Sequence, residues 1–133
     1  MARLIKQSEG KRLGLPGRSS LEPVSGDIGS RCSVRIATIP VPEPGAKGTK
    51  RGPHLHRDFE EVIYVLSGRG TTHAESGEIA IAPGDIVVIP PGEKHMTQNT
   101  GTEPLVLLCF FPAADVAGAT QEPGVSLRAP KKS

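Results

Sequence analysis

Proline and glycine interrupt this chain so often that long helices are disfavoured. The 133 residues include 13 prolines and 16 glycines, which cluster between short apolar or alternating runs and mark turns there. Seven such runs have the length of a strand, at residues 31–39, 61–67, 69–74, 77–82, 85–90, 94–99 and 104–111. Short strands at this spacing, without a helical period, predict an all-β antiparallel sandwich or barrel.

The length and the uneven composition predict one domain with two dissimilar ends. A chain of this size buries a single core. We assign residues 1–30 to an N-terminal arm with edge strands, 31–112 to the barrel and 113–133 to a C-terminal tail. The tail is small, polar and proline-containing, so we expect about its last fifteen residues to be poorly ordered.

The charge pattern gives little support to a nucleic-acid partner. The formal net charge is +2, and the basic residues of the first twenty are Arg3, Lys6, Lys11, Arg12 and Arg18. A basic arm is more often a solubilising tail than a nucleic-acid contact. With one tyrosine, three phenylalanines and no tryptophan, the chain also lacks the stacking surface of single-strand binders.

Apolar segments and cysteines predict the compartment. The longest apolar run, LVLLCFF at 105–111, is only long enough for a strand, and the first residues contain no signal-like apolar stretch. Cys32 and Cys109 are too few for a disulfide framework. We therefore expect no membrane partner and a cytoplasmic protein with reduced cysteines.

The stretch GPHLHRDFEEVIYVLSG, at 52–68, carries candidate metal ligands. His54 and His56 lie two residues apart, so in a strand both side chains leave the same face. A carboxylate and a third histidine would complete a mixed site suited to Mn, Fe, Ni, Cu or Zn. Such a pair taken alone fits solvated or core histidines equally well, and Glu60 and Glu61 both remain candidates for the carboxylate.

Two spaced motifs resolve these alternatives. The first reads G-x5-HxH-x4-E-x6-G from Gly48 to Gly68, and the second reads G-x5-P-x-G-x2-H-x3-N from Gly84 to Asn99. At every fixed position this sequence resembles the cupin superfamily, in particular its small single-domain members. The resemblance implies a double-stranded β-helix, or jelly-roll barrel, of six to eight strands. It also implies one divalent transition metal, with the ligands His54, His56, Glu61 and His95.

The alternation of the strand at 61–67 is consistent with that choice of glutamate. Ile63 and Val65 share the face of Glu61, so an apolar interior would surround the carboxylate. The opposite face, with Val62, Tyr64 and Leu66, is also apolar, and a strand that is apolar on both faces is usually buried on both. We expect another sheet or a second subunit to cover it, and predict a homodimer.

Several neighbours are candidates for contacts around the metal. Thr97 shares the inward face of His95 and is a plausible acceptor for a ligand histidine, and Asn99 is expected chiefly to close the following turn. His73 is either a partly exposed structural histidine or a proton-transfer group, and we favour the former. Arg57 and Arg69 could bind an anionic substrate at the barrel mouth, but solvated arginines are the simpler interpretation.

The predicted function is that of a small metalloenzyme acting on an oxygenated small molecule, as an oxygenase, isomerase, lyase or cyclase. Such a centre leaves coordination positions open for a substrate or water. Two alternatives remain: a non-catalytic protein that binds a small ligand or metal, and a barrel whose site stays empty in the cell. The fold does not choose among them.

Overall fold

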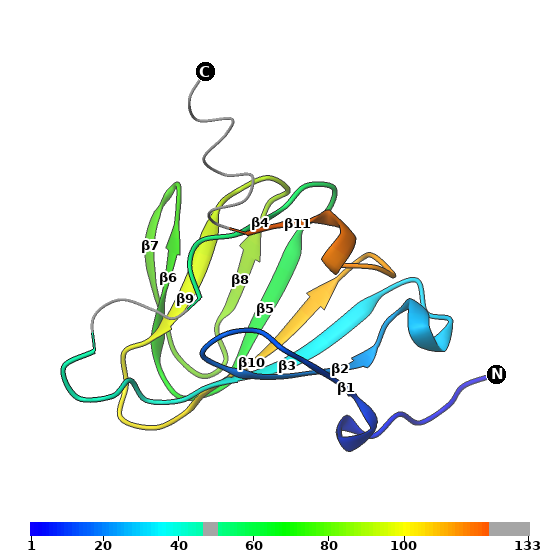
Figure 1. Ribbon diagram of the computed structural model, residues 1–133, viewed down its shortest axis with the longest axis horizontal. Helices are drawn as coiled ribbons and strands as arrows, with labels where there is room; N and C mark the ends of the chain where they lie inside the picture. Colours follow the sequence, from blue (N-terminus) through cyan, green and yellow to red (C-terminus); the bar gives the residue numbers. More distant parts are fainter. Residues whose placement is uncertain (47–50, 123–133) are drawn as a thin grey trace.

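A computed structural model describes residues 1–46 and 51–122 of the chain (Figure 1). Gly48, the first position of the first motif, and residues 123–133 of the predicted tail lie outside the described residues. The elements follow one another as η1 (Gln7–Glu9), β1 (Lys11–Leu13), β2 (Ser19–Val24), η2 (Gly26–Ile28), β3 (Ser33–Ile39), β4 (Leu55–His56), β5 (Glu61–Ser67), β6 (Gly70–Ala74), β7 (Gly77–Ile81), β8 (Ile86–Ile89), β9 (His95–Asn99), β10 (Leu105–Phe111), η3 (Ala117–Ala119) and β11 (Thr120–Gln121). The predicted all-β class is confirmed, and each of the seven predicted runs contains a strand.

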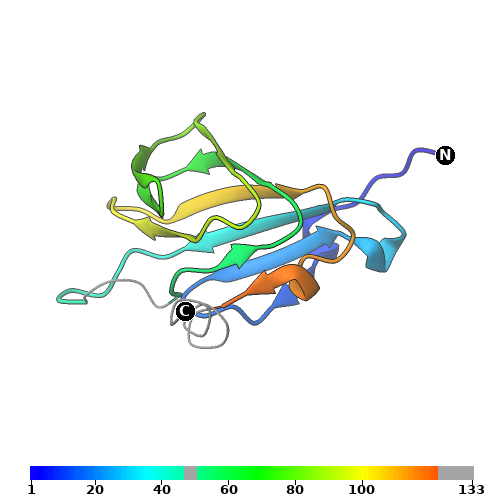
Figure 2. The same ribbon diagram turned by 90° about the horizontal axis from the view of Figure 1, so that it is seen from above.

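The strands form three antiparallel sheets. The large sheet has the order β1-β2-β3-β10-β5-β8, the small sheet has the order β7-β6-β9, and β4 pairs with β11. Among the described strands, these sheets are not hydrogen-bonded into one closed barrel. Figures 1 and 2 place the β6–β7 hairpin and the N-terminus at opposite ends of the molecule.

The inner face of β5 is the one that its sequence predicts. Glu61, Ile63 and Val65 are buried, whereas Tyr64 and Leu66 are exposed. Ile63 and Val65 belong to the apolar core, together with residues of β10 such as Leu107. Val65 lies opposite Leu107 and Ile63 opposite Cys109 in the ladder between the two strands. This pairing keeps the inner residues of both strands on one side of the sheet.

The inner face of β3 is more polar than its hydrophobic alternation suggests. The sequence alternates Val34 and Ile36 with polar neighbours, yet both are only half-buried. Ser33 and Ala37 are buried instead, and Arg35 lines an internal cavity. The reason is local, because this part of the sheet faces a polar cavity rather than the apolar core.

The N-terminal segment carries edge strands, and the first part of the assigned tail is folded against the sheets. β1 and β2 extend the large sheet beyond β3. Residues 113–121, which we assigned to the tail, pack against the strands, because Val116 and Ala119 are buried in the core. Thr120 and Gln121 then pair with His56 and Leu55. Burial of the apolar side chains of Val116 and Ala119 stabilises this segment although most of its other residues are polar or small.

The described residues include no helix that is long and apolar enough to cross a membrane.

Replacing Gly68 by alanine is expected to destabilise the fold by about 2–4 kcal/mol. Gly68 has a φ of +84°, and a Cβ there would lie 2.4 Å from the carbonyl oxygen of Pro104 and 2.7 Å from the Cα of Leu105. Backbone strain and a clash with backbone atoms would therefore add. The free energy of unfolding in urea measures the loss.

Gly84→Ala is the matched control. Gly84 has a φ of +91°, but a Cβ there would meet nothing within 4 Å. Only the cost of the left-handed conformation remains, about 1–2 kcal/mol. Equal losses for the two variants would contradict the clash at Gly68.

Candidate metal centre

The four candidate ligands come from three short segments that meet between the sheets. His54 precedes β4 and His56 lies within it, while Glu61 begins β5 and His95 begins β9. His54 and His95 form an isolated bridge through two backbone hydrogen bonds, of 3.0 and 2.9 Å. This bridge brings the two motifs together although forty residues of sequence separate them.

The ligand atoms converge and are buried. The four residues His54, His56, Glu61 and His95 are each at most 5% exposed, and one ligand atom of each lies within 4.8 Å of all the others. Ligand atoms on opposite sides of one transition-metal ion lie about 4 Å apart, because each bond is about 2 Å long. Shifts of a few tenths of an ångström would therefore suffice for all four to bind one ion.

Each histidine turns its Nδ1 away from the cluster. Nδ1 of His54 lies 3.3 Å from the Gly52 carbonyl oxygen, and Nδ1 of His95 lies 2.9 Å from the Glu93 carbonyl oxygen. A carbonyl only accepts, so Nδ1 of each ring carries a proton, and Nε2 of the neutral ring keeps a lone pair for a ligand bond.

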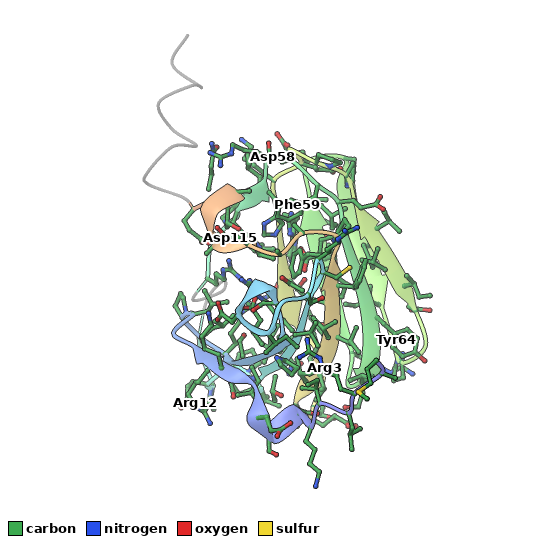
Figure 3. The ribbon with its side chains drawn as sticks, turned by 90° about the vertical axis from the view of Figure 1, so that its right-hand side faces the viewer. Arg3, Arg12, Asp58, Phe59, Tyr64 and Asp115 are labelled. Carbon is green, nitrogen blue, oxygen red and sulfur yellow. The ribbon has the colours of Figure 1, made fainter. Side chains whose placement is uncertain are left out.

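His56 reaches the same state through a hydroxyl. The Thr120 hydroxyl donates to the Val116 carbonyl at 2.7 Å, so its oxygen accepts from Nδ1 of His56 at 2.9 Å. The ring is also stacked on Phe59, with centroids 5.7 Å apart. Figure 3 labels Phe59 in the upper part of the view, near Asp58 and Asp115. No motif pointed to Thr120, which lies 64 residues after His56 and in the predicted tail.

Glu61 and His95 are electrostatically coupled. Burial raises the pKa of the Glu61 carboxyl, but its interactions with His56 and His95 outweigh it and hold that pKa well below its usual range. Burial lowers the pKa of His95, but the Glu61 carboxylate, 3.0 Å from Nε2, raises it overall. A second proton, on Nε2 of His95, thus occupies the position in which a cation would neutralise Glu61, and a bound metal would replace it.

His54 stays neutral. Burial, and then the positive charge of Arg51, lower its pKa to about 2. A neutral imidazole is the form that binds metals.

The cluster fits a transition metal on its own geometry. Nε2 of His56 is buried and has no hydrogen-bond partner among the described residues, although it lies 3.2 Å from Oε1 of Glu61. With its proton on Nδ1, the ring offers this carboxylate oxygen only a lone pair. A cation between the two atoms would satisfy both, and three imidazoles with one carboxylate suit a divalent transition metal.

A small cavity of about 30 Å³ opens beside the cluster. Apart from the four candidate ligands, the titratable side chains that line it are Arg18, Arg35, Arg51 and Cys109. Burial, and then the Glu61 carboxylate, raise the pKa of the Cys109 thiol well above its ordinary value. The sequence indicated Cys109 only as a reduced cysteine and did not single out these arginines as cavity residues.

Of the other residues predicted near the metal, only Thr97 lines the cavity. Thr97 is buried and lines the cavity. His73 contacts Glu78 and Gln98 instead, and is not among the cavity residues. Asn99 accepts from the Gly101 amide and so closes its turn, as expected. Glu60 is exposed, so the structure brings Glu61 and not Glu60 to the histidines.

Neither arginine proposed at the mouth lines the cavity. Arg57 and Arg69 are both exposed, and Arg57 donates to the Gly118 carbonyl at 2.6 Å. The solvated interpretation of these two residues agrees with their positions.

The family comparison agrees with this geometry. Residues 43–111 match the cupin domain family. The chain belongs to this family. The expected cupin resemblance is therefore confirmed, and solved cupin structures support the fold.

Three similar proteins illustrate the range of the family. Glucose-6-phosphate isomerase of Thermococcus gammatolerans is 40% identical over 70 residues, which are 49% of this chain and 37% of that enzyme. A protein of Acidithiobacillus ferrooxidans, proposed to be a sugar phosphate isomerase, is 32% identical, with a TM-score of 0.60 over 81% of this chain and 73% of that one. Oxalate decarboxylase of Lactobacillus farciminis, in a formate complex, has a TM-score of 0.71 at 22% identity over 87% of this chain and 34% of that one. The chain spans less than two thirds of the length of the curated relatives it matches.

His54 predicts an acid-sensitive contribution to stability in the metal-free protein. In the unfolded chain its pKa is near 6.5, whereas in the fold it is about 2. As the pH falls below 6.5, the unfolded state therefore binds a proton that the native state does not. Between pH 7 and pH 5 this should lower the free energy of unfolding by about 2 kcal/mol.

His95 acts in the opposite direction, so the test is a difference. Its raised pKa contributes stability that is present below about pH 6.5 and is lost as the pH rises through the folded pKa. Urea unfolding in EDTA at pH 7, 6 and 5 compares the wild type with His54→Gln. The variant should lose less stability on acidification, and parallel curves would contradict the buried neutral His54.

Proposed function

We propose that this protein is a metal-dependent enzyme that acts on a small oxygenated molecule, such as a carboxylate, an enol or a sugar acid. The observation that carries the proposal is the convergence of four buried donor groups beside a cavity. Structural metal sites are usually closed, whereas catalytic sites keep a position for the substrate.

One divalent ion of Mn, Fe, Ni, Cu or Zn is the proposed cofactor. His54, His56 and His95 would each supply Nε2, and Glu61 a carboxylate oxygen. Such an ion, when bound, would polarise a substrate oxygen, stabilise an enolate or activate water. Relatives that bear the names of an isomerase and a decarboxylase support catalysis in general without selecting a reaction.

The chain's own residues would bind and orient the substrate and limit its contact with water. Glu61 is the one negative group in the cluster, and the apolar side chains of Ile63, Leu107 and Phe111 line the same cavity. Their low polarity strengthens every charge interaction inside the site. Cys109, whose raised pKa keeps the thiol protonated, is the one neutral proton-bearing acid near Glu61 among the described cavity residues.

A non-catalytic binding protein is the second candidate. Apart from the four candidate ligands, the described cavity residues include no histidine and no carboxylate, the usual general acids and bases. A protein that only holds a metal or a small ligand needs no such group.

Metal content tests the site. Purified protein should bind about one divalent transition metal per chain, measured by inductively coupled plasma mass spectrometry. Glu61→Gln should lower occupancy strongly because it removes the anionic ligand, whereas Glu60→Gln should leave it unchanged. No uptake by the wild type from Mn, Fe, Ni, Cu or Zn, or the reverse order of the two variants, would refute the site.

Thr120 offers a graded version of this test. Thr120→Val removes the acceptor of the His56 Nδ1 proton and should weaken metal binding by about 10- to 100-fold, as losses of such supporting contacts do. Thr120→Ser keeps the hydroxyl and should bind as the wild type does. Equal affinity of the valine variant would show that His56 needs no support from Thr120.

Turnover by the same metal-loaded preparations separates the two candidates. Keto acids, diketones, catechols, uronates and sugar phosphates form the panel, with Glu61→Gln as the matched control. Metal-dependent turnover that this variant loses would support an enzyme. Tight binding of one compound without conversion would support the binding protein.

We also propose that the chain forms a homodimer through the outer face of β5 and β8. Tyr64 is 40% exposed, Ile86 62% and Val88 55%, and the two strands pair so that Tyr64 lies opposite Ile86. Figure 3 shows Tyr64 at the outer side of the large sheet. Adjacent exposed apolar side chains on one sheet face suit a contact with a second copy.

Introducing negative charges on the outer face of β8 tests the dimer. Ile86→Glu combined with Val88→Glu should give a monomer by size-exclusion chromatography with light scattering, because buried carboxylates would face each other across the interface. Ile79→Glu, at an exposed apolar residue of the small sheet, is the control and should stay dimeric. A wild type that is monomeric at micromolar concentration would refute the proposal.

The proposed cytoplasmic location is supported by thiol chemistry alone. Cys32 is half-buried and Cys109 buried, and both are free. Disulfides are rare in reducing compartments, so two unpaired cysteines agree with such a location.

A further inference from the structure

The cavity beside the metal cluster is lined by three arginines, and two of them have carboxylate partners. Arg35 pairs with Glu22 at 2.8 Å and lies over the ring of Phe111. Arg51 pairs with Glu122 at 2.8 Å. The positive charges of Arg35 and Arg51 are thereby balanced within the protein.

Arg18 is different. It is the last residue of the loop between β1 and β2, drawn in dark blue in Figure 1, and it is half-buried at the cavity. It makes no ion pair or hydrogen bond with the residues that the structure describes, and its Nε is buried without a partner. Burial, and then repulsion from Arg51, lower the pKa of its guanidinium. An unpaired buried donor of this kind is costly for the fold and suggests a ligand.

The charge around the cluster favours an anion as that ligand. Glu61 is the one carboxylate among the four candidate metal ligands, so a divalent ion would leave a positive charge there in addition to that of Arg18. The planar guanidinium matches a carboxylate with two parallel hydrogen bonds. The volume of about 30 Å³ favours a small acid over a larger phosphorylated sugar.

We propose that Arg18 binds the carboxylate of a small acid in this cavity, with the other oxygens of the ligand directed toward the cluster of His54, His56, Glu61 and His95. The orientation toward the cluster rests on the proposed metal site. The carboxylate contact rests on Arg18 alone. This assigns a ligand-binding residue to the N-terminal hairpin, outside both motifs.

Calorimetric titration with malonate tests the contact in metal-free and in metal-loaded protein. Arg18→Gln should weaken malonate binding by about 10- to 100-fold in both forms, as expected for the loss of charge-assisted hydrogen bonds. Arg12→Gln is the matched control, because Arg12 is an exposed arginine on neighbouring β1 and should bind malonate as the wild type does.

The outcomes separate this proposal from the proposed function. Malonate binding that depends on Arg18 in a protein that takes up no metal would refute the metal site and keep the carboxylate contact. Equal affinity in Arg18→Gln and Arg12→Gln, or no malonate binding by the wild type, would overturn the contact. Arg18-dependent binding of inorganic phosphate that is tighter than that of malonate would overturn the carboxylate assignment.

Thermal stability distinguishes a ligand-binding arginine from a structural one. Arg18→Met should melt at the same temperature as the wild type or higher, because it removes an uncompensated charge. Arg35→Met should melt lower, because it leaves the buried Glu22 without its closest partner. An equal fall for both variants would overturn the proposal.

Chemical modification keeps the test available if the variants fail to fold. Phenylglyoxal modifies accessible arginines, and peptide mass spectrometry reads Arg18 and Arg12 in the wild type. Malonate should protect Arg18 and leave Arg12 reactive, and unchanged reactivity of Arg18 would refute the contact.

Discussion

The ionised carboxylate of Glu61 is the constraint around which the interior is arranged. A buried charge is tolerated only where compensating groups surround it. His95 supplies that compensation at 3.0 Å from one carboxylate oxygen, and a cation bound between the same oxygen and Nε2 of His56, which lie 3.2 Å apart, would add to it. These two histidines and Glu61 must therefore be held together, which requires β4, β5 and β9 to meet at one place although they belong to different sheets.

The contacts behind the histidines explain why segments remote in sequence are ordered. The bridge between His54 and His95 joins the two motifs. The Thr120 hydroxyl orients His56, and the buried side chains of Val116 and Ala119 hold the segment that carries Thr120. The same contacts fix the C-terminal end of the described chain against the sheets.

Alternation within short segments predicted the strands and the inner face of β5, whereas the set of four clustered side chains came from the resemblance of two separate motifs to the cupin superfamily. The sequence did not predict Thr120, whose contact with His56 arises from the pairing of β11 with β4. It also missed the polar inner face of β3, because hydrophobic alternation assumes an apolar interior. Arg18, Ser20 and Glu22 alternate toward the inside on β2 and the residue before it, but in sequence Arg18 could not be told from the solvated basic residues around it.

The hairpin of β1 and β2 has a consequence for how such a protein can diversify. It joins the large sheet only at the outer edge of β3, yet its connecting loop carries Leu15 and Arg18 to the cavity. Changes in the length or residues of this loop would alter what enters the cavity while the strands that carry the candidate metal ligands stay as they are. In the proposed scheme, ligand selection and metal binding therefore reside on separate pieces of the polypeptide and can be inherited, exchanged or redesigned one at a time.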